Sequence, residues 1–330
     1  MTVCIAAICS WGQGRLMVVG ASDRMLSGPD IQFEPPQSKL YQFLPSVVAL
    51  VAGDPYDQMT ICEAAARHIH VSPRPPTTVG DVAKIYADAF TAHRRRVAET
   101  KILVPHGLDA NSLMDRQQDF RREVVADLMN RMETCELGVE AIITGVDPDG
   151  SAHIFVVTDP GQIACADAIA FASIGTGKQH ADSQFMLANH TRHVPWERAL
   201  LSTYIAKKRA EVSPTVGRTH TDLFFVGGTS TSQYQAIADP IHNAIRRTWE
   251  DLERIIAIET ERLSIGAHQF IDEYIRRLHE PPAPTPPQPL QEIVAEPTPP
   301  AVSPPETKVK TAKPAAKRPK KSRVRRKSGS

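Results

Sequence analysis

The chain has 330 residues, of which 42% are apolar, and its formal net charge is +1. This length allows one large domain or two ordinary ones, and the apolar fraction is sufficient for a sizeable core. No apolar run approaches the roughly 20 residues of a membrane span, and the N-terminus lacks a secretory leader. We therefore expect a cytoplasmic protein without a membrane segment.

Short apolar runs separated by turn residues predict five strands in the N-terminal part of the chain: 2–9, 16–21, 31–33, 38–43 and 46–52. The first two flank a Gly-containing loop and predict a hairpin. A helix is expected next, with Asp57 as its N-cap.

The rest of the chain alternates between helical and strand patterns. Helical spacing predicts helices at 79–99, 112–133, 178–190, 195–211 and 236–279. Strands are expected at 139–145, 151–158, 162–165 and 221–228. Runs of strands alternating with runs of helices argue against a parallel βαβ sheet. They predict an α+β fold, a four-layer αββα sandwich with two packed antiparallel sheets and helices outside.

The composition changes after residue 279. Thirteen of the 27 prolines lie within 281–319, and residues 308–327 hold 11 Lys and Arg and no acidic residue. Residues 1–307 therefore carry a net charge of −10, and the tail is strongly basic. We expect three parts: a folded domain over 1–235, a helical extension over 236–280 and a disordered Pro-rich and basic tail over 281–330.

Cofactor and metal signatures are weak. The five cysteines are odd in number, scattered and without a CxxC pair, which favours free buried thiols. The histidines lack metal-ligand spacing, and GTGK at 175–178 lacks the other residues of a phosphate-binding loop. We expect no cofactor and no metal.

Thr2 stands directly after Met1 and at the start of the first predicted strand. Removal of Met1 would leave an α-amine on Thr2, with an ordinary pKa of about 8, that can act as a base for the hydroxyl of the same residue. A nearby ammonium would lower the pKa of this amine. Lys39 is a candidate for that ammonium, with Asp23 to balance its charge. Gly53 ends a buried strand, where a bare backbone N–H suits a developing oxyanion.

Residues 2–60 resemble a proteasome β-type subunit, a member of the N-terminal nucleophile (Ntn) hydrolases. That family has an Asp after its second strand, a Lys sixteen residues later and a Gly fourteen residues after the Lys. The intervals Asp23–Lys39 and Lys39–Gly53 match both spacings. The resemblance implies that Thr2 is the nucleophile, that Asp23 and Lys39 are the charged pair around it, and that Gly53 is the oxyanion donor.

The family also has a Gly-Ser-Gly turn whose Ser approaches the amine of the nucleophile. Gly175–Thr176–Gly177 stands in that place, so the resemblance gives this role to Thr176. The later segment SPTVGRTHTD offers Ser213, Thr215 and Asp222, and the sequence leaves their alignment with the family open.

The resemblance implies a threonine peptidase that cleaves peptides or proteins inside a homo-oligomer, either a closed ring or an open helical ring. No ATP-binding motif is present, so any unfoldase would be a separate partner. Two alternatives stay open: a non-proteolytic proteasome-like scaffold whose basic tail binds nucleic acid or a partner protein, and a small-amide acylase of the same superfamily. Helix 236–279 fits either a surface helix of its own domain or a packing arm between subunits.

Overall fold

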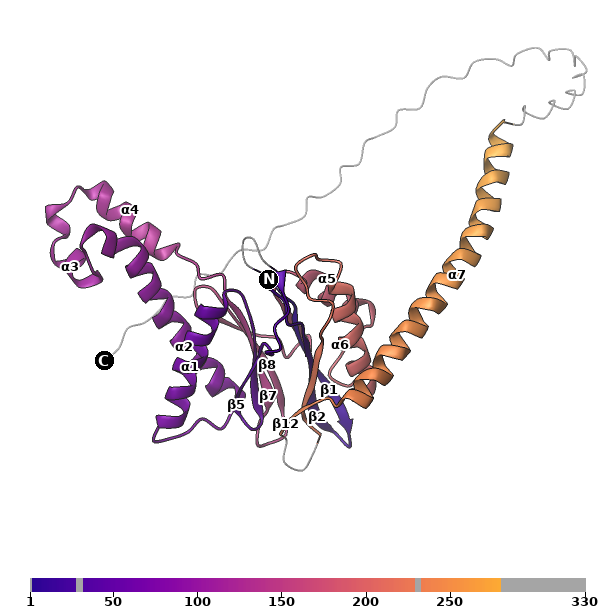
Figure 1. Ribbon diagram of the computed structural model, residues 1–330, viewed down its shortest axis with the longest axis horizontal. Helices are drawn as coiled ribbons and strands as arrows, with labels where there is room; N and C mark the ends of the chain where they lie inside the picture. The colour runs from indigo at the N-terminus through magenta and orange to yellow at the C-terminus, as the bar shows by residue number, and fades with distance from the viewer. Residues whose placement is uncertain (1, 28–31, 229–232, 280–330) are drawn as a thin grey trace, which may run out of the picture. The chain divides into compact units, whose positions relative to one another are not determined.

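The structure is a computed structural model that describes residues 2–27, 32–228 and 233–279 (Figure 1). The chain forms two compact units, Met1–Gly266 and Ala267–Ser330. The described part of the second unit is the C-terminal end of one helix, α7 (Asp239–His279). The tail predicted over 281–330 lies outside the described residues.

Two five-stranded antiparallel sheets form the centre of the first unit. The first sheet has the order β10 (Phe171–Ile174), β1 (Cys4–Gly12), β2 (Arg15–Ser22), β11 (Asp222–Gly227) and β12 (Tyr234–Ala236). The second has the order β5 (Leu40–Leu44), β6 (Val47–Ala52), β7 (Glu140–Val146), β8 (Ala152–Thr158) and β9 (Gln162–Cys165). The short strands β3 (Leu26–Ser27) and β4 (Gln32–Phe33) pair with each other.

Helices cover the outer face of each sheet (Figure 1). The second sheet packs against α1 (Pro55–Val71) and α2 (Val79–Ala98), and the first sheet packs against α5 (Lys178–Leu187) and α6 (Trp196–Ala210). A third apolar cluster joins the two sheets face to face. The predicted α+β sandwich of four layers is therefore confirmed.

Strand β1 shows why this fold requires almost wholly apolar strands. Cys4, Ala6 and Ile8 enter the cluster between the sheets. Their neighbours along the strand, such as Ile5 and Ala7, enter the cluster under α5 and α6. Alternate side chains of a strand point to opposite faces, so a strand covered on both faces must be apolar at every position.

Several local expectations are corrected. The first helix is capped by Asp54, whose side chain accepts from the N–H groups of Tyr56 and Asp57, and Asp57 lies inside the helix. The helix expected over 112–133 is broken into α3 (Ala110–Asp115), a 3-10 turn and α4 (Arg122–Glu133). Strands β10 and β12 were not predicted. None of the described helices is long and apolar enough to cross a bilayer.

Candidate active site

The first β-hairpin places Thr2 beside Asp23. Cys4 of β1 pairs with Ser22 of β2, so the residues just before β1 and just after β2 are neighbours. The backbone N–H of Asp23 donates to the carbonyl oxygen of Val3 at 3.2 Å. The spacing between the two residues along the chain therefore depends only on the length of the hairpin.

The second hairpin brings Lys39 and Gly53 to the same end of the sandwich. Leu40 of β5 pairs with Leu50 of β6, and Val51 N–H donates to the carbonyl oxygen of Lys39 at 3.2 Å. Gly53 follows β6 with a φ of 119°, and a Cβ there would lie 2.3 Å from the carbonyl oxygen of Gly138. Positive φ and this close approach together require glycine.

Thr2, Asp23 and Lys39 form one hydrogen-bonded group. The hydroxyl of Thr2 donates to Asp23 Oδ1, and Lys39 Nζ donates to Thr2 Oγ1. Lys39 Nζ also lies 3.1 Å from Asp23 Oδ1 and donates to the carbonyl oxygen of Met25. The Lys39 ammonium thus has three oxygen partners, the number of donors it carries.

Asp23 is the most enclosed member of this group, with no exposed surface. Besides the side chains of Thr2 and Lys39, its carboxylate accepts from three backbone N–H groups: Val3 at 3.1 Å, Met25 at 3.3 Å and Gly217 at 2.7 Å. Buried charges are tolerated when every lone pair is satisfied. The site therefore holds a carboxylate and an ammonium in fixed positions around one hydroxyl.

The turn after β10 lies against the backbone of Thr2. Gly175 has a φ of 85°, and a Cβ there would lie 2.2 Å from the carbonyl oxygen of Thr2. Gly177 N–H donates to that oxygen at 3.3 Å, and the hydroxyl of Thr176 lies 3.5 Å from it. The Thr176 hydroxyl also contacts that of Thr215 at 2.8 Å.

The sequence left open the roles of Ser213, Thr215 and Asp222, and the first two of these residues reach this turn. Ser213 Oγ lies 3.2 Å from Thr215 Oγ1, which extends the chain of hydroxyl groups from Thr176. Asp222 instead forms an ion pair with Arg24 at 2.5 Å. Its role is to hold the end of β2 against β11.

Two charged side chains that the sequence did not single out hold the loop between α6 and β11. Glu34 accepts from the N–H groups of Arg218, Thr219 and His220. Burial opposes ionisation of Glu34, but these N–H groups outweigh it and lower the pKa of the carboxyl to about 2. Lys207, fully buried, donates to the carbonyl oxygen of Gly217 at 2.8 Å. Burial lowers the pKa of Lys207, although Glu211 beside it acts in the opposite direction.

A pocket of about 430 Å³ opens at Thr2. Its lining includes Thr2, Gly53 and Thr176, so three of the five predicted site residues border one cavity. A second pocket of about 440 Å³ begins at Lys39 and has an apolar wall of Tyr41, Val51 and other side chains. Cys4 lies nearby, but burial raises the pKa of its thiol to about 12 despite the opposing charge of Lys39, so it is not a competing nucleophile.

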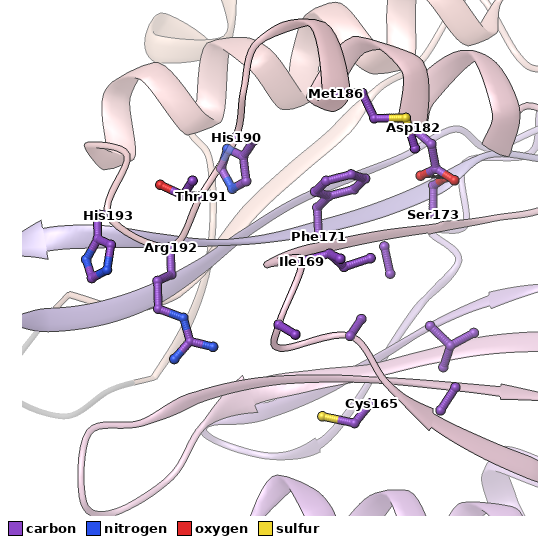
Figure 2. A pocket seen from close by; sticks show the side chains of 15 residues that line it. Cys165, Ile169, Phe171, Ser173, Asp182, Met186, His190, Thr191, Arg192 and His193 are labelled. Atoms are coloured by element: carbon purple, nitrogen blue, oxygen red, sulfur yellow. Dashed lines mark hydrogen bonds between the residues drawn. The ribbon is translucent and has the colours of Figure 1, made fainter. Parts of the chain in front are cut away.

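A larger cavity, of about 810 Å³, shares no lining residue with the pocket at Thr2. Figure 2 shows Arg192 and His193 at one end of it, Asp182 and Ser173 at the other, and Phe171 between them. Two of its charged side chains already have partners: Asp182 accepts from Ser173 at 2.6 Å, and Arg192 donates to the carbonyl oxygen of Asp167. We therefore place the candidate active site in the pocket at Thr2 and not in this larger cavity.

The arrangement of two antiparallel sheets between helical layers is that of the Ntn hydrolase fold. Two solved structures of this fold are similar to the chain. One is Anbu (ancestral beta-subunit) from Yersinia bercovieri, with a TM-score of 0.54, 17% identity, and coverage of 78% of this chain and 96% of that one. The other is a helical assembly of the Anbu complex from Pseudomonas aeruginosa, with a TM-score of 0.51, 18% identity, and coverage of 86% and 99%. No protein-family model and no curated protein matches the sequence.

These comparisons correct the assignment to the proteasome β-type subunits. The similar structures are Anbu proteins, and at 17% and 18% identity they establish the fold alone. The interval from Lys39 to Gly53 is the length of the β5–β6 hairpin, and the interval from Asp23 to Lys39 is the length of the connection between the β1–β2 and β5–β6 hairpins. Any chain that builds this corner of the fold needs similar spacings, so the spacings do not identify one subfamily.

Proposed function

We propose that the protein is an Ntn amidohydrolase, most specifically a threonine peptidase, whose nucleophile is Thr2 after removal of Met1. The observation that carries this proposal is the pair of hydrogen bonds to one hydroxyl, to Asp23 and from Lys39, at the edge of an open pocket. A surface threonine in a strand has no need of a buried ion pair around its hydroxyl.

In this mechanism the freed α-amine of Thr2 takes the proton of its own hydroxyl while the oxygen attacks a peptide carbonyl carbon. Lys39 donates to the attacking oxygen and Asp23 fixes Lys39. The new oxyanion faces the N–H of Gly53. The amine then returns the proton to the leaving nitrogen, and water hydrolyses the ester left on Thr2 with the amine again as base.

We propose further that the chain works as a homo-oligomer. The similar Pseudomonas aeruginosa structure is a helical assembly, and an open helical ring of this chain would restrict access to the nucleophile. A separate unfoldase and contact between the basic tail and nucleic acid remain predictions from the sequence.

The proposal is tested by measuring the mass and the peptidase activity of three purified proteins: the wild type, Thr2→Ala and Thr2→Ser. Intact-mass measurement should show loss of one Met from the wild type, and an electrophilic peptide analogue should label Thr2. Thr2→Ala should lower peptide cleavage by about 10³-fold or more with the fold unchanged, while Thr2→Ser, which keeps a hydroxyl, should retain measurable turnover. Retained Met1, or cleavage by purified Thr2→Ala, would contradict the mechanism.

A small-amide acylase is the second candidate, because the pocket at Lys39 is discrete and has an apolar wall. Such an enzyme would use the same nucleophile on a short acyl group. Comparing kcat/KM for extended peptides with that for short N-acyl amides separates the two: a preference for the amides would favour the acylase. If Met1 is retained and neither substrate is cleaved, the scaffold function is favoured.

A further inference from the structure

The C-terminal half of α7 carries an apolar stripe that no described residue covers. Its members recur at intervals of three, four and seven residues: Ile256, Leu263, Ala267, Phe270, Tyr274 and Leu278. These intervals place the side chains on one face of a helix. Leu263 is 64% exposed and Phe270 is 74% exposed. The stripe holds five of the ten large apolar side chains that are exposed along residues 255–278, and an exposed row of this kind indicates an interaction surface.

Charged residues follow one side of this stripe in an alternating order. Glu259 pairs with Arg262 at 2.8 Å, and Glu273 pairs with Arg277 at 2.5 Å. Read along the chain, the signs are minus, plus, minus, plus. Read in the opposite direction, every sign is reversed, so the pattern is complementary to itself when two copies run antiparallel.

The apolar residues fit the same antiparallel register. If Ala267 faces the partner's Phe270, then Leu263 faces the partner's Tyr274, and the two-fold axis passes between residues 268 and 269. The small side chain of Ala267 then lies opposite a large one, as close helix packing requires. In this register Glu259 lies beside the partner's Arg277, and Arg262 lies beside the partner's Glu273.

We propose that the α7 stripe is a self-association surface that pairs antiparallel with the same stripe of a second copy of this chain. The contact is isologous, because each copy contributes the same residues. Apolar side chains form the seam, and four charged pairs on its flanks select the antiparallel orientation. This inference makes no use of the proposed peptidase chemistry.

Two double variants test the register directly: E259R/R262E and E273R/R277E. Each keeps an opposite-charge pair within its own helix, so the stability of the helix should change little. In each variant alone, all four charged pairs across the seam become like-charged. When the two variants are mixed, all four become opposite-charged. Sedimentation velocity should show a lower average mass for each variant alone than for the wild type, and the wild-type value for an equimolar mixture.

Two single variants provide matched controls for the apolar seam. Phe270→Asp places a charge in the stripe and should lower the average mass like the double variants. Ile265→Asp places the same charge on the opposite face, at an isoleucine that is 59% exposed, and should leave the mass unchanged. Circular dichroism should give equal helix content for all forms. A monomeric wild type, unchanged mass in either double variant alone, or a mixture that fails to recover would overturn the proposal.

Discussion

At the scale of single residues, the buried pair near Thr2 is asymmetric. Asp23 accepts from three backbone N–H groups in addition to Lys39 and Thr2. Lys39 has one carboxylate partner, and its other two partners are neutral oxygens. Removing the carboxylate therefore leaves more groups unsatisfied than removing the ammonium does.

We predict that Asp23→Ala destabilises the fold more than Lys39→Met. The first change leaves a buried ammonium without its counter-charge and also orphans backbone N–H groups, which costs about 3–5 kcal/mol. After the second change the carboxylate keeps its backbone donors, so the expected loss is about 1–2 kcal/mol. Urea unfolding of both variants measures the difference. Both should be inactive, and equal destabilisation would contradict the asymmetry.

The sequence identified Asp23 and Lys39 because they carry opposite charges and their interval matches that of the family that the chain resembles. It did not identify Gly217 or Glu34, which act through backbone N–H groups. Gly217 donates to Asp23 across 194 positions of the chain, and any residue except proline has the N–H that this bond uses. No residue type marks such a contact, so spacing within one sequence cannot reveal it.

At the scale of elements, the loop between α6 and β11 is held from three sides. Glu34 binds its N–H groups, Lys207 binds the carbonyl oxygen of Gly217, and Gly217 N–H binds Asp23. The loop thus links Glu34 to the carboxylate of Asp23 through backbone hydrogen bonds. We regard Glu34 as a positioning residue, because it contacts the loop and not Thr2.

We predict that Glu34→Gln lowers the free energy of unfolding by about 1–3 kcal/mol at neutral pH. The folded-state pKa of Glu34, about 2, is below the unfolded value. Its contribution is therefore fully present above the unfolded pKa of about 4.3 and is lost as the pH falls towards 2. Urea unfolding at pH 7, 5 and 3 should show the difference between wild type and variant shrinking at pH 3. Glu123→Gln, at an exposed position of α4, should change stability by less than about 0.5 kcal/mol.

Most long elements and the short strand β9 could be predicted, whereas β10 and β12 could not. Strand β6 is apolar at each of its six positions and lies between a sheet and a helical layer. Strand β10 has four residues, and its FASI sequence precedes a Gly-rich turn. Its strand conformation depends on pairing with β1, whose partner residues lie about 170 positions away. Local pattern carries no information about that pairing.

At the scale of the whole molecule, the contacts of the first turns of α7 bear on the domain boundary predicted at residue 235. Ile245 and Trp249 are partly buried and pack against the apolar cluster under the first sheet. The same cluster contains Ile5 of β1 and Tyr204 of α6. We therefore propose that the first turns of α7 fold together with the sandwich.

We predict that Trp249→Ala in the full chain lowers the melting temperature of the sandwich, because it removes a large side chain from that cluster, at a cost of about 2–4 kcal/mol for a partly buried aromatic. Ile258→Ala, at a 58% exposed position of the same helix, should leave the temperature nearly unchanged. Calorimetry measures both variants. If the sandwich melts at the wild-type temperature in Trp249→Ala, the start of α7 is an appendage and the folded domain ends before it. If it melts lower in a single transition, the first turns of α7 are part of the cooperative unit that holds Thr2 in place.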